Sequence, residues 1–293
     1  MRALIRVLAS WIVVLVAAPA VRAADLDELR ARGVLRHLGV PYANFVSGAG
    51  DGMDVELIQA FAQSIGVKYE FVQADWGTVI PDLIGRKVKV VNGRGELQAQ
   101  VPVKGDLIAN GFTMLPWRQT VVEYSRPTFP SQIWLVARVD SPLRPIEPAA
   151  DVQQDIARTR ALMKGRTVLT VEKTCLDASL YDFGSAGAKV VSFKGNLNDV
   201  APALVKGEAD LTILDVPDAL VALEKWHSQI KILGPISAPQ TMATAFPKDA
   251  PKLLKAYEEF LAKAKQDGTY LRLVKKYYPT AAGYFPEFFE GMR

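Results

Sequence analysis

Apolar residues recur along this chain with two spacings that alternate. Between residues 54 and 66 they repeat every three or four positions, as on one face of a helix, and Gly66 ends the pattern. Short apolar runs at 34–40 and 68–72 are typical of strands instead. Strands that alternate with helices in this way predict an α/β fold with a mostly parallel sheet.

A second alternating set follows the proline-rich segment 140–148. Its strands are predicted at 167–171, 189–193, 210–214 and 230–233. Its helices are predicted at 151–163, 175–181, 198–205 and 216–226. After Gly234-Pro235 come a strand at 241–246 and a long helix at 250–266, which we assign to the first set.

The second set is therefore predicted to be inserted into the first, with two chain crossings near 131–138 and 234–240. Two such crossings form a hinge between two lobes. We expect lobe 1 to comprise residues 24–134 and 238–293, and lobe 2 to comprise residues 135–237. Because ligands of such sheets bind beyond the carboxyl ends of the strands, the cleft between the lobes is the expected binding site.

A hairpin pattern interrupts the first set. Apolar and polar residues alternate between Lys87 and Val103 on both sides of Asn92-Gly93, a dipeptide that favours a tight two-residue turn. The segment joins a helix to the strand that follows it. We therefore expect the hairpin at the end of lobe 1 that lies away from the ligand.

The first 23 residues have the pattern of a secretory signal peptide. Arg2 and Arg6 give a positive start, residues 8–18 are apolar, and Val21-Arg22-Ala23 supplies small residues for cleavage after Ala23. The apolar run is shorter than the ~20 residues of a membrane span. An uncleaved N-terminal anchor is the alternative. We expect a processed, soluble protein in the periplasm.

Charge and cysteine content argue against several kinds of protein. Removing the three arginines of the signal peptide from the 35 Lys and Arg leaves 32 against 31 Asp and Glu, which disfavours nucleic acid as a partner. Cys175 is the single cysteine, so we expect neither an intrachain disulfide nor a lipid anchor. His37 and His227 are scattered, whereas a zinc site needs clustered ligands. We expect no metal and no cofactor.

Several short segments carry a resemblance to a known family. They are Gly52–Leu57, Trp76 with Ile80–Leu83, Gly105–Thr113, Pro116–Ser125, Gly165–Val168, Gly207–Asp215 and Asp267–Tyr278. In their order and spacing, the chain resembles the extracellular solute-binding proteins of family 3, the polar-amino-acid receptors of ABC importers. The resemblance covers nearly all of the chain after the signal peptide. It implies the two-lobed periplasmic-binding-protein fold of type II, with a two-strand hinge.

The resemblance implies that lobe 1 binds a carboxylate of the solute. In the family an arginine grips this group, and Arg118 stands at the matching position, although the residues alone also allow a surface arginine. A guanidinium can form two parallel hydrogen bonds with a carboxylate. Asn110, Gly111 and Thr113 match further contacts to the same carboxylate. Leu115 departs from the family, which often has threonine there, so one expected donor is missing.

In lobe 2 the resemblance assigns the ligand's α-amino group to Asp215, after the strand 210–214. This aspartate is also expected to cap the helix that follows. Thr174 matches a further carboxylate donor at the start of the predicted 175–181 helix, whose amides favour anions. Lys173 stands where the family has glycine, and its amine either reaches a second acidic group of the ligand or points into water.

Aromatic side chains are expected to form walls of the ligand pocket. Tyr42 and Phe45 follow the first strand and Trp76 follows the second, so all three are candidates. Each of them is equally compatible with a place in the core. Tyr42 is the strongest candidate, because it follows Pro41 in a loop at the expected edge.

These features predict a monomeric periplasmic protein that closes on a small polar solute, an amino acid or related carboxylate, and delivers it to an ABC importer permease. We expect no enzymatic activity. One alternative is a dehydratase-like enzyme with Glu172 as its candidate carboxylate. Another is a sensor or accessory protein that uses the hairpin or the aromatic segment 284–289. Lytic transglycosylases also resemble this family, but we expect the chain to end with its binding domain.

Overall fold

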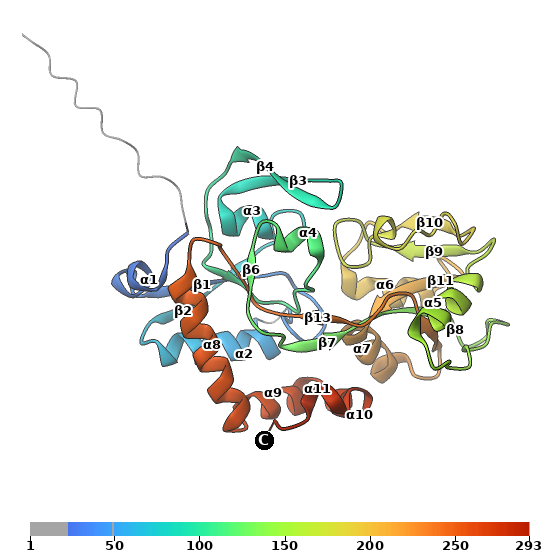
Figure 1. The fold of residues 1–293 in the computed structure, drawn as a ribbon. Helices are drawn as coiled ribbons and strands as arrows, with labels where there is room; N and C mark the ends of the chain where they lie inside the picture. Colours follow the sequence, from blue (N-terminus) through green and yellow to red (C-terminus); the bar gives the residue numbers. More distant parts are fainter. Residues whose placement is uncertain (1–22, 49, 293) are drawn as a thin grey trace, which may run out of the picture.

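Two lobes lie side by side in the computed structural model, which describes residues 23–48 and 50–292 (Figure 1). Each lobe is built on one five-stranded sheet with helices around it. The predicted fold class of two α/β lobes is confirmed. The predicted signal peptide lies outside the described residues, apart from Ala23.

The first sheet has the strand order β2-β1-β5-β14-β6. Its strands are β1 (Val34–Gly39), β2 (Lys68–Gln73), β5 (Leu107–Ile108), β6 (Glu123–Tyr124) and β14 (Ala245–Phe246). β14 is antiparallel to its two neighbours and so runs opposite to the other four strands. The helices of this lobe are α1 (Leu26–Arg32), α2 (Met53–Ser64), α3 (Val79–Ile84), α4 (Pro116–Gln119), α8 (Pro251–Gln266) and α9 (Thr269–Tyr277).

The second sheet has the order β10-β9-β11-β8-β12, and β8 runs opposite to the other four strands. Its strands are β8 (Ile133–Arg138), β9 (Thr167–Thr170), β10 (Lys189–Ser192), β11 (Leu211–Asp215) and β12 (Ile230–Pro235). Its helices are α5 (Val152–Ala161), α6 (Val200–Val205) and α7 (Val216–Trp226), with short 3-10 turns η1 (Ala178–Leu180) and η2 (Leu197–Asp199).

The predicted helix at 175–181 is wrong, because only the short turn η1 forms there. The Asp177 carboxylate accepts hydrogen bonds from the backbone amides of Lys173, at 2.9 Å, and Ser179, at 3.0 Å. Lys173 itself has a φ of +64°, outside the helical region. These local contacts hold the backbone in a turn that competes with helix formation.

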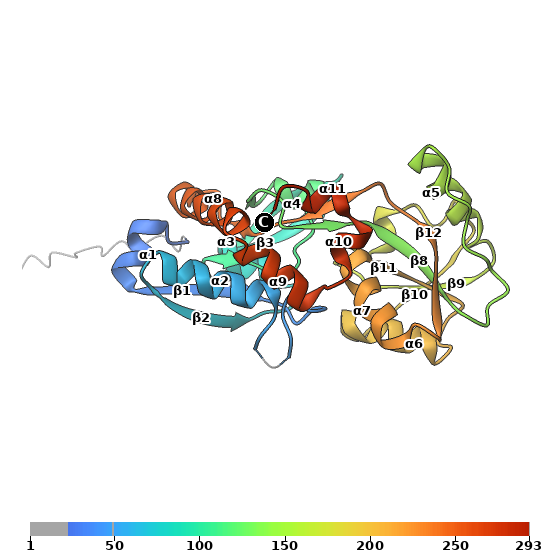
Figure 2. The ribbon, with the colours of Figure 1, turned by 90° about the horizontal axis from the view of Figure 1, so that it is seen from below.

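A two-stranded antiparallel sheet connects the lobes, as the predicted two-strand hinge requires. It consists of β7 (Phe129–Ser131) and β13 (Gln240–Met242). The C-terminal helices α10 (Ala281–Tyr284) and α11 (Pro286–Phe289) lie beside this connection (Figure 2). Phe289 meets Phe129 with ring centroids 6.0 Å apart, and Phe285 stacks on Trp134 at 6.3 Å. The predicted residue limits of the lobes stay a prediction.

The predicted hairpin is present as β3 (Arg86–Val91) and β4 (Arg94–Gln100). Asn92 and Gly93 form its turn with φ values of +50° and +71°, as a tight two-residue loop of this type needs. The hairpin lies over α3 and α4, with its turn directed toward the second lobe (Figure 1). The Gly95 amide fixes it to lobe 1 by donating to Thr120 Oγ1 at 2.9 Å.

Candidate functional site

Arg118 is buried at the cleft although no carboxylate of the described residues pairs with it. α4 begins at Pro116 and turns this side chain inward, where it is 2% exposed. One Nη atom donates to the Thr113 carbonyl at 3.1 Å, but Nε has no partner within the described ranges. Burial lowers the pKa of Arg118. Since a buried ion without a counter-charge is costly, this guanidinium is arranged to bind an anion.

Three aromatic rings surround the guanidinium. Its central carbon lies 4.1 Å from the ring centroid of Phe112, 5.5 Å from that of Trp117 and 6.0 Å from that of Trp76. Ring faces attract a cation and offset part of its desolvation. Of the predicted aromatic walls, Trp76 therefore lies next to the cation. Sequence reasoning missed Phe112, whose only signal was its place in the loop after β5.

The loop after β5 carries the other predicted carboxylate contacts, and Thr113 among them contacts this arginine. Asn110 is fully buried, and neither its Oδ1 nor its Nδ2 has a partner among the described residues. The Gly111 amide is already engaged, since it donates to Asp54 Oδ2 at 2.7 Å. Thr113 offers its carbonyl to Arg118. The polar groups without a partner here are thus the Asn110 amide and Arg118 Nε.

Gly111 is required for packing as well as for backbone conformation. Its φ is +62°, and a Cβ atom there would lie 2.3 Å from the ring of Phe45. Phe45 is turned into the core of lobe 1, where its centroid lies 5.2 Å from that of Phe129 and 5.0 Å from that of Tyr278. The close approach expected of a ligand at Gly111 is therefore made by Phe45, which does not line the cleft cavities.

Asp215 ends β11 and is fully buried. Its Oδ1 accepts from the Asp218 amide at 3.3 Å, which is the expected cap of α7, and also from the Tyr42 hydroxyl. Its Oδ2 accepts from the Cys175 thiol at 3.2 Å. Burial raises the pKa of Asp215. Because Tyr42 belongs to lobe 1, its hydrogen bond to Asp215 joins the two lobes across the cleft.

The loop after β9 brings three residues of lobe 2 to the cleft. The Thr174 hydroxyl is used locally: it donates to the Val171 carbonyl at 2.7 Å and accepts from the Leu176 amide at 2.9 Å. Lys173 is exposed, and its amine forms no hydrogen bond or ion pair within the described residues. Cys175 interacts with both Arg118 and Asp215, a role that its status as the single cysteine did not reveal.

Glu172, the candidate carboxylate of an enzyme, lies in a polar and exposed setting. Its Oε1 accepts from the Ser192 hydroxyl at 2.7 Å and from the Lys194 amine at 3.1 Å. These contacts lower the pKa of Glu172. A carboxylate that stays ionised in this way is a weak general acid at neutral pH.

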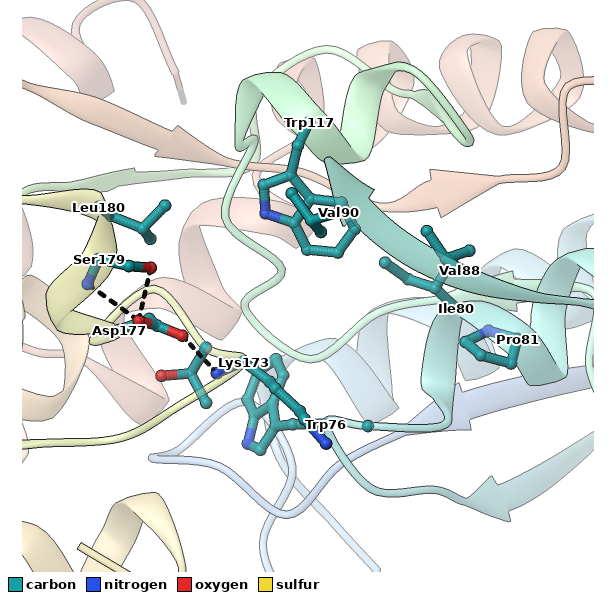
Figure 3. Close-up of a pocket in the computed structure, with 12 residues that line it drawn as sticks. Trp76, Ile80, Pro81, Val88, Val90, Trp117, Lys173, Asp177, Ser179 and Leu180 are labelled. Atoms are coloured by element: carbon teal, nitrogen blue, oxygen red, sulfur yellow. Dashed lines mark hydrogen bonds between the residues drawn. The ribbon is translucent and has the colours of Figure 1, made fainter. Parts of the chain in front are cut away.

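Two cavities open beside the closed contact between Tyr42 and Asp215. One, of about 370 Å³, lies between the hairpin and lobe 2, with Val88 and Val90 in its wall (Figure 3). The other, of about 420 Å³, also borders Trp76 and has a more polar lining, which includes Asp75, Glu172 and Lys194. The prediction that the hairpin lies away from the ligand edge is therefore wrong. A hairpin that leaves α3 on this side folds back over α4 and reaches the cleft.

The described residues hold neither a helix long and apolar enough to cross a bilayer nor a cluster of three or more His, Cys, Asp and Glu side chains suited to a metal ion.

Comparison with known proteins matches residues 39–96 and 97–280 to the bacterial extracellular solute-binding proteins, family 3. The chain belongs to this family. A curated relative, the amino-acid-binding protein AabA of Dichelobacter nodosus, is 24% identical over 79% of this chain and 81% of its own. The membrane-bound lytic murein transglycosylase F of Pseudomonas putida (strain F1) is 25% identical over 92% of this chain. The chain spans about half, 51%, of that protein's length.

Solved structures of amino-acid-binding proteins share the fold. The P235GK mutant of ArgBP from T. maritima is 26% identical, with a TM-score of 0.68 over 87% of this chain and 99% of its own. The ancestral amino-acid-binding protein AncCDT-1, described as a precursor of cyclohexadienyl dehydratase, is 25% identical, with a TM-score of 0.65 over 86% and 98%. The chain is thus a solute-binding protein by family and by architecture.

Proposed function

We propose that this family-3 protein works in the periplasm as a monomer, closes its lobes on a small carboxylate, and passes it to the permease of an ABC importer. The solute is an amino acid or a related acid. The observation that carries the proposal is Arg118, a buried cation with an unpartnered Nε atom and no carboxylate beside it. The unpartnered Asn110 amide, in the loop that precedes α4, offers a second polar group.

Lobe closure follows from the contacts between the lobes. Tyr42 donates to Asp215, and the Ala43 amide donates to Asn198 Oδ1 at 2.8 Å, so the lobes are in contact in a closed arrangement. Arg118 is too buried to meet a solute there, and opening at the β7–β13 connection is needed to expose it. Closing over a bound carboxylate then removes water and strengthens its charge-assisted hydrogen bonds.

Isothermal titration of the purified protein with the amino acids and a set of dicarboxylates tests this function. Micromolar binding corresponds to about −8 kcal/mol. Mass spectrometry of the molecule released on denaturation identifies a solute that is retained during purification. We expect a carboxylate to bind the wild type and to lose affinity in Arg118→Met. Binding that the variant leaves unchanged, or no binding at all, contradicts the proposal.

Binding without chemistry is the function that we propose. Glu172 is exposed, and its contacts with Ser192 and Lys194 lower its pKa, which makes it a poor proton donor for the dehydratase-like alternative. The similarity to lytic transglycosylases covers about half of their length and supports a shared solute-binding fold.

A further inference from the structure

The acceptor expected for an α-ammonium group is already occupied by this chain. A zwitterionic amino acid needs an anionic partner for its ammonium, and Asp215 is the candidate. Both Asp215 oxygens accept hydrogen bonds, from the Tyr42 hydroxyl and the Asp218 amide on one side and from the Cys175 thiol on the other. Asp215 is fully buried. Three donors therefore share the roughly four acceptor positions of this carboxylate, so an incoming ammonium would find most of them taken.

The cationic side of the site shows the opposite condition. Arg118 Nε and both polar atoms of the Asn110 side chain are buried without partners in the described part of the chain. Buried polar groups are normally hydrogen-bonded, and two of these three atoms, Arg118 Nε and Asn110 Nδ2, are donors, so they indicate a missing acceptor such as a ligand carboxylate. The site therefore has free donors for the carboxylate of a solute, whereas Asp215, the expected acceptor for its amine, already has hydrogen-bond partners.

Closure of the lobes is a second reason why Asp215 is unsuited to an ammonium group. The Tyr42–Asp215 hydrogen bond spans the cleft, so an ammonium that took its place would remove one of the contacts that join the lobes. The other buried acid nearby, Asp218, faces Lys225 and lines a separate cavity of about 80 Å³. That volume is too small for a whole amino acid.

We infer that the solute is a carboxylate without an α-ammonium group, with Tyr42 in the place of the amine. This inference rests on the proposed function and narrows it to one chemical class. Tyr42 is then a specificity-determining residue, since it satisfies Asp215 and leaves an ammonium without a counter-charge.

Matched pairs of ligands test the inference by calorimetry. The pairs are alanine with propionate, aspartate with succinate, glutamate with glutarate, and phenylalanine with 3-phenylpropionate. For the pair that binds, we expect the acid without the amine to bind at least about tenfold tighter to the wild type. Tyr42→Phe keeps the ring but removes the hydroxyl that binds Asp215. It should therefore reduce the ratio between the affinities for the two members of the pair. Tyr257→Phe, which removes another buried hydroxyl of lobe 1 (bonded to Thr244), is the control and should keep it.

The outcomes separate this inference from the function on which it rests. If the wild type prefers the amino acid of a pair, and Arg118→Met abolishes that binding, only the inference is overturned. A ratio that Tyr42→Phe leaves unchanged also overturns it. If neither member of any pair binds, or if Arg118→Met binds as well as the wild type, the proposed function itself is contradicted.

A different observation, the cavity beside the hairpin, carries a second inference. Its walls include Ile80, Val88 and Val90 from lobe 1 and Leu180 from lobe 2 (Figure 3). Val90 is 48% exposed and Leu180 40% exposed, so apolar side chains of both lobes are left uncovered at the same cleft. Trp76 lines this cavity as well.

The cavity lies one ring away from the anion site. Trp76 and Trp117 both line it, and the Arg118 guanidinium lies 6.0 Å and 5.5 Å from their ring centroids. We propose that this cavity receives an apolar body, aromatic or branched aliphatic, of the solute whose carboxylate binds Arg118. Because the walls come from both lobes, filling the cavity favours the closed form.

Comparison of 3-phenylpropionate with propionate tests this second inference. Burial of a ring should make the phenyl acid bind about tenfold tighter or more. Val90→Lys places a charge in the wall and should remove the preference. Leu97→Lys is the matched control, because Leu97 is 51% exposed on the partner strand and does not line the cavity. If the wild type shows no preference, or if the preference survives Val90→Lys, the cavity is not the site of the apolar body. Binding of propionate still tests the carboxylate site at Arg118 in either case.

Discussion

Replacement of Arg118 by methionine should stabilise the protein without ligand and weaken its binding of carboxylates. Opposite effects on stability and binding are expected of a charge that is buried for the sake of a ligand. Methionine keeps most of the apolar stem of the side chain in its packing position. The variant removes a guanidinium that has one hydrogen bond, to Thr113, and an unpartnered Nε.

The change in stability follows from two opposing contributions. Exchange of buried charges for apolar residues stabilises proteins by about 1–4 kcal/mol. The rings of Phe112, Trp117 and Trp76 stabilise the arginine by about 1 kcal/mol, the magnitude of one cation–π contact, and this offsets part of the gain. We therefore expect a gain of roughly 1–3 kcal/mol in the free energy of unfolding. Loss of the carboxylate contact should weaken binding by at least about 2 kcal/mol, or roughly thirtyfold.

Differential scanning calorimetry of the ligand-free proteins and isothermal titration with the bound carboxylate measure the two effects. Each kcal/mol should raise Tm by about 2–4 °C. Arg36→Met is the control, because Arg36 pairs with the fully buried Asp106 at 2.9 Å. It should lower Tm and leave binding intact. The reasoning is refuted if Arg118→Met lowers Tm as Arg36→Met does and still binds the carboxylate with wild-type affinity.

Three further predictions follow from the same contacts. Gly111→Ala should destabilise by roughly 2–4 kcal/mol in thermal melts, through its positive φ and its overlap with Phe45, whereas Gly66→Ala, which meets nothing within 4 Å, should cost only about 1 kcal/mol. Cys175 is 4% exposed between the lobes, so a thiol reagent should label it only during opening, and a bound solute should slow the labelling; an unchanged rate would argue against closure. Burial raises the pKa of Asp54 to about 7. The folded state therefore favours the protonated carboxyl, and the wild type loses this contribution to its stability as pH rises from about 4 through 7. Asparagine does not titrate, so the Tm of Asp54→Asn relative to that of the wild type should increase over that range.

The local pattern of residues was sufficient for most of the secondary structure. Helix α2, the hairpin β3–β4 and helix α7 all form where the sequence predicts them. Helical spacing, strand alternation and the Asn92-Gly93 turn act over a few residues, so they can be read without knowledge of the rest of the chain. The helix expected at 175–181 does not form, because the Asp177 carboxylate accepts hydrogen bonds from backbone amides before and after Asp177 in the chain.

The site depended on contacts that no local pattern encodes. Arg118 and Asp215 were identified through the resemblance to family 3, but their sequence positions do not show that one lacks a partner and the other has several. Tyr42 and Asp215 are separated by 173 residues and meet only when the lobes close.

Patterns along the chain were enough to predict the two α/β lobes, the hairpin turn and the family, because periodicity and motif order are properties of neighbouring residues. Only the tertiary structure decided that Phe45 fills the space beside Gly111 and that the hairpin walls the cleft. Periodicity tells which face of an element is buried, whereas the partner on that face is chosen by packing between elements far apart in the chain.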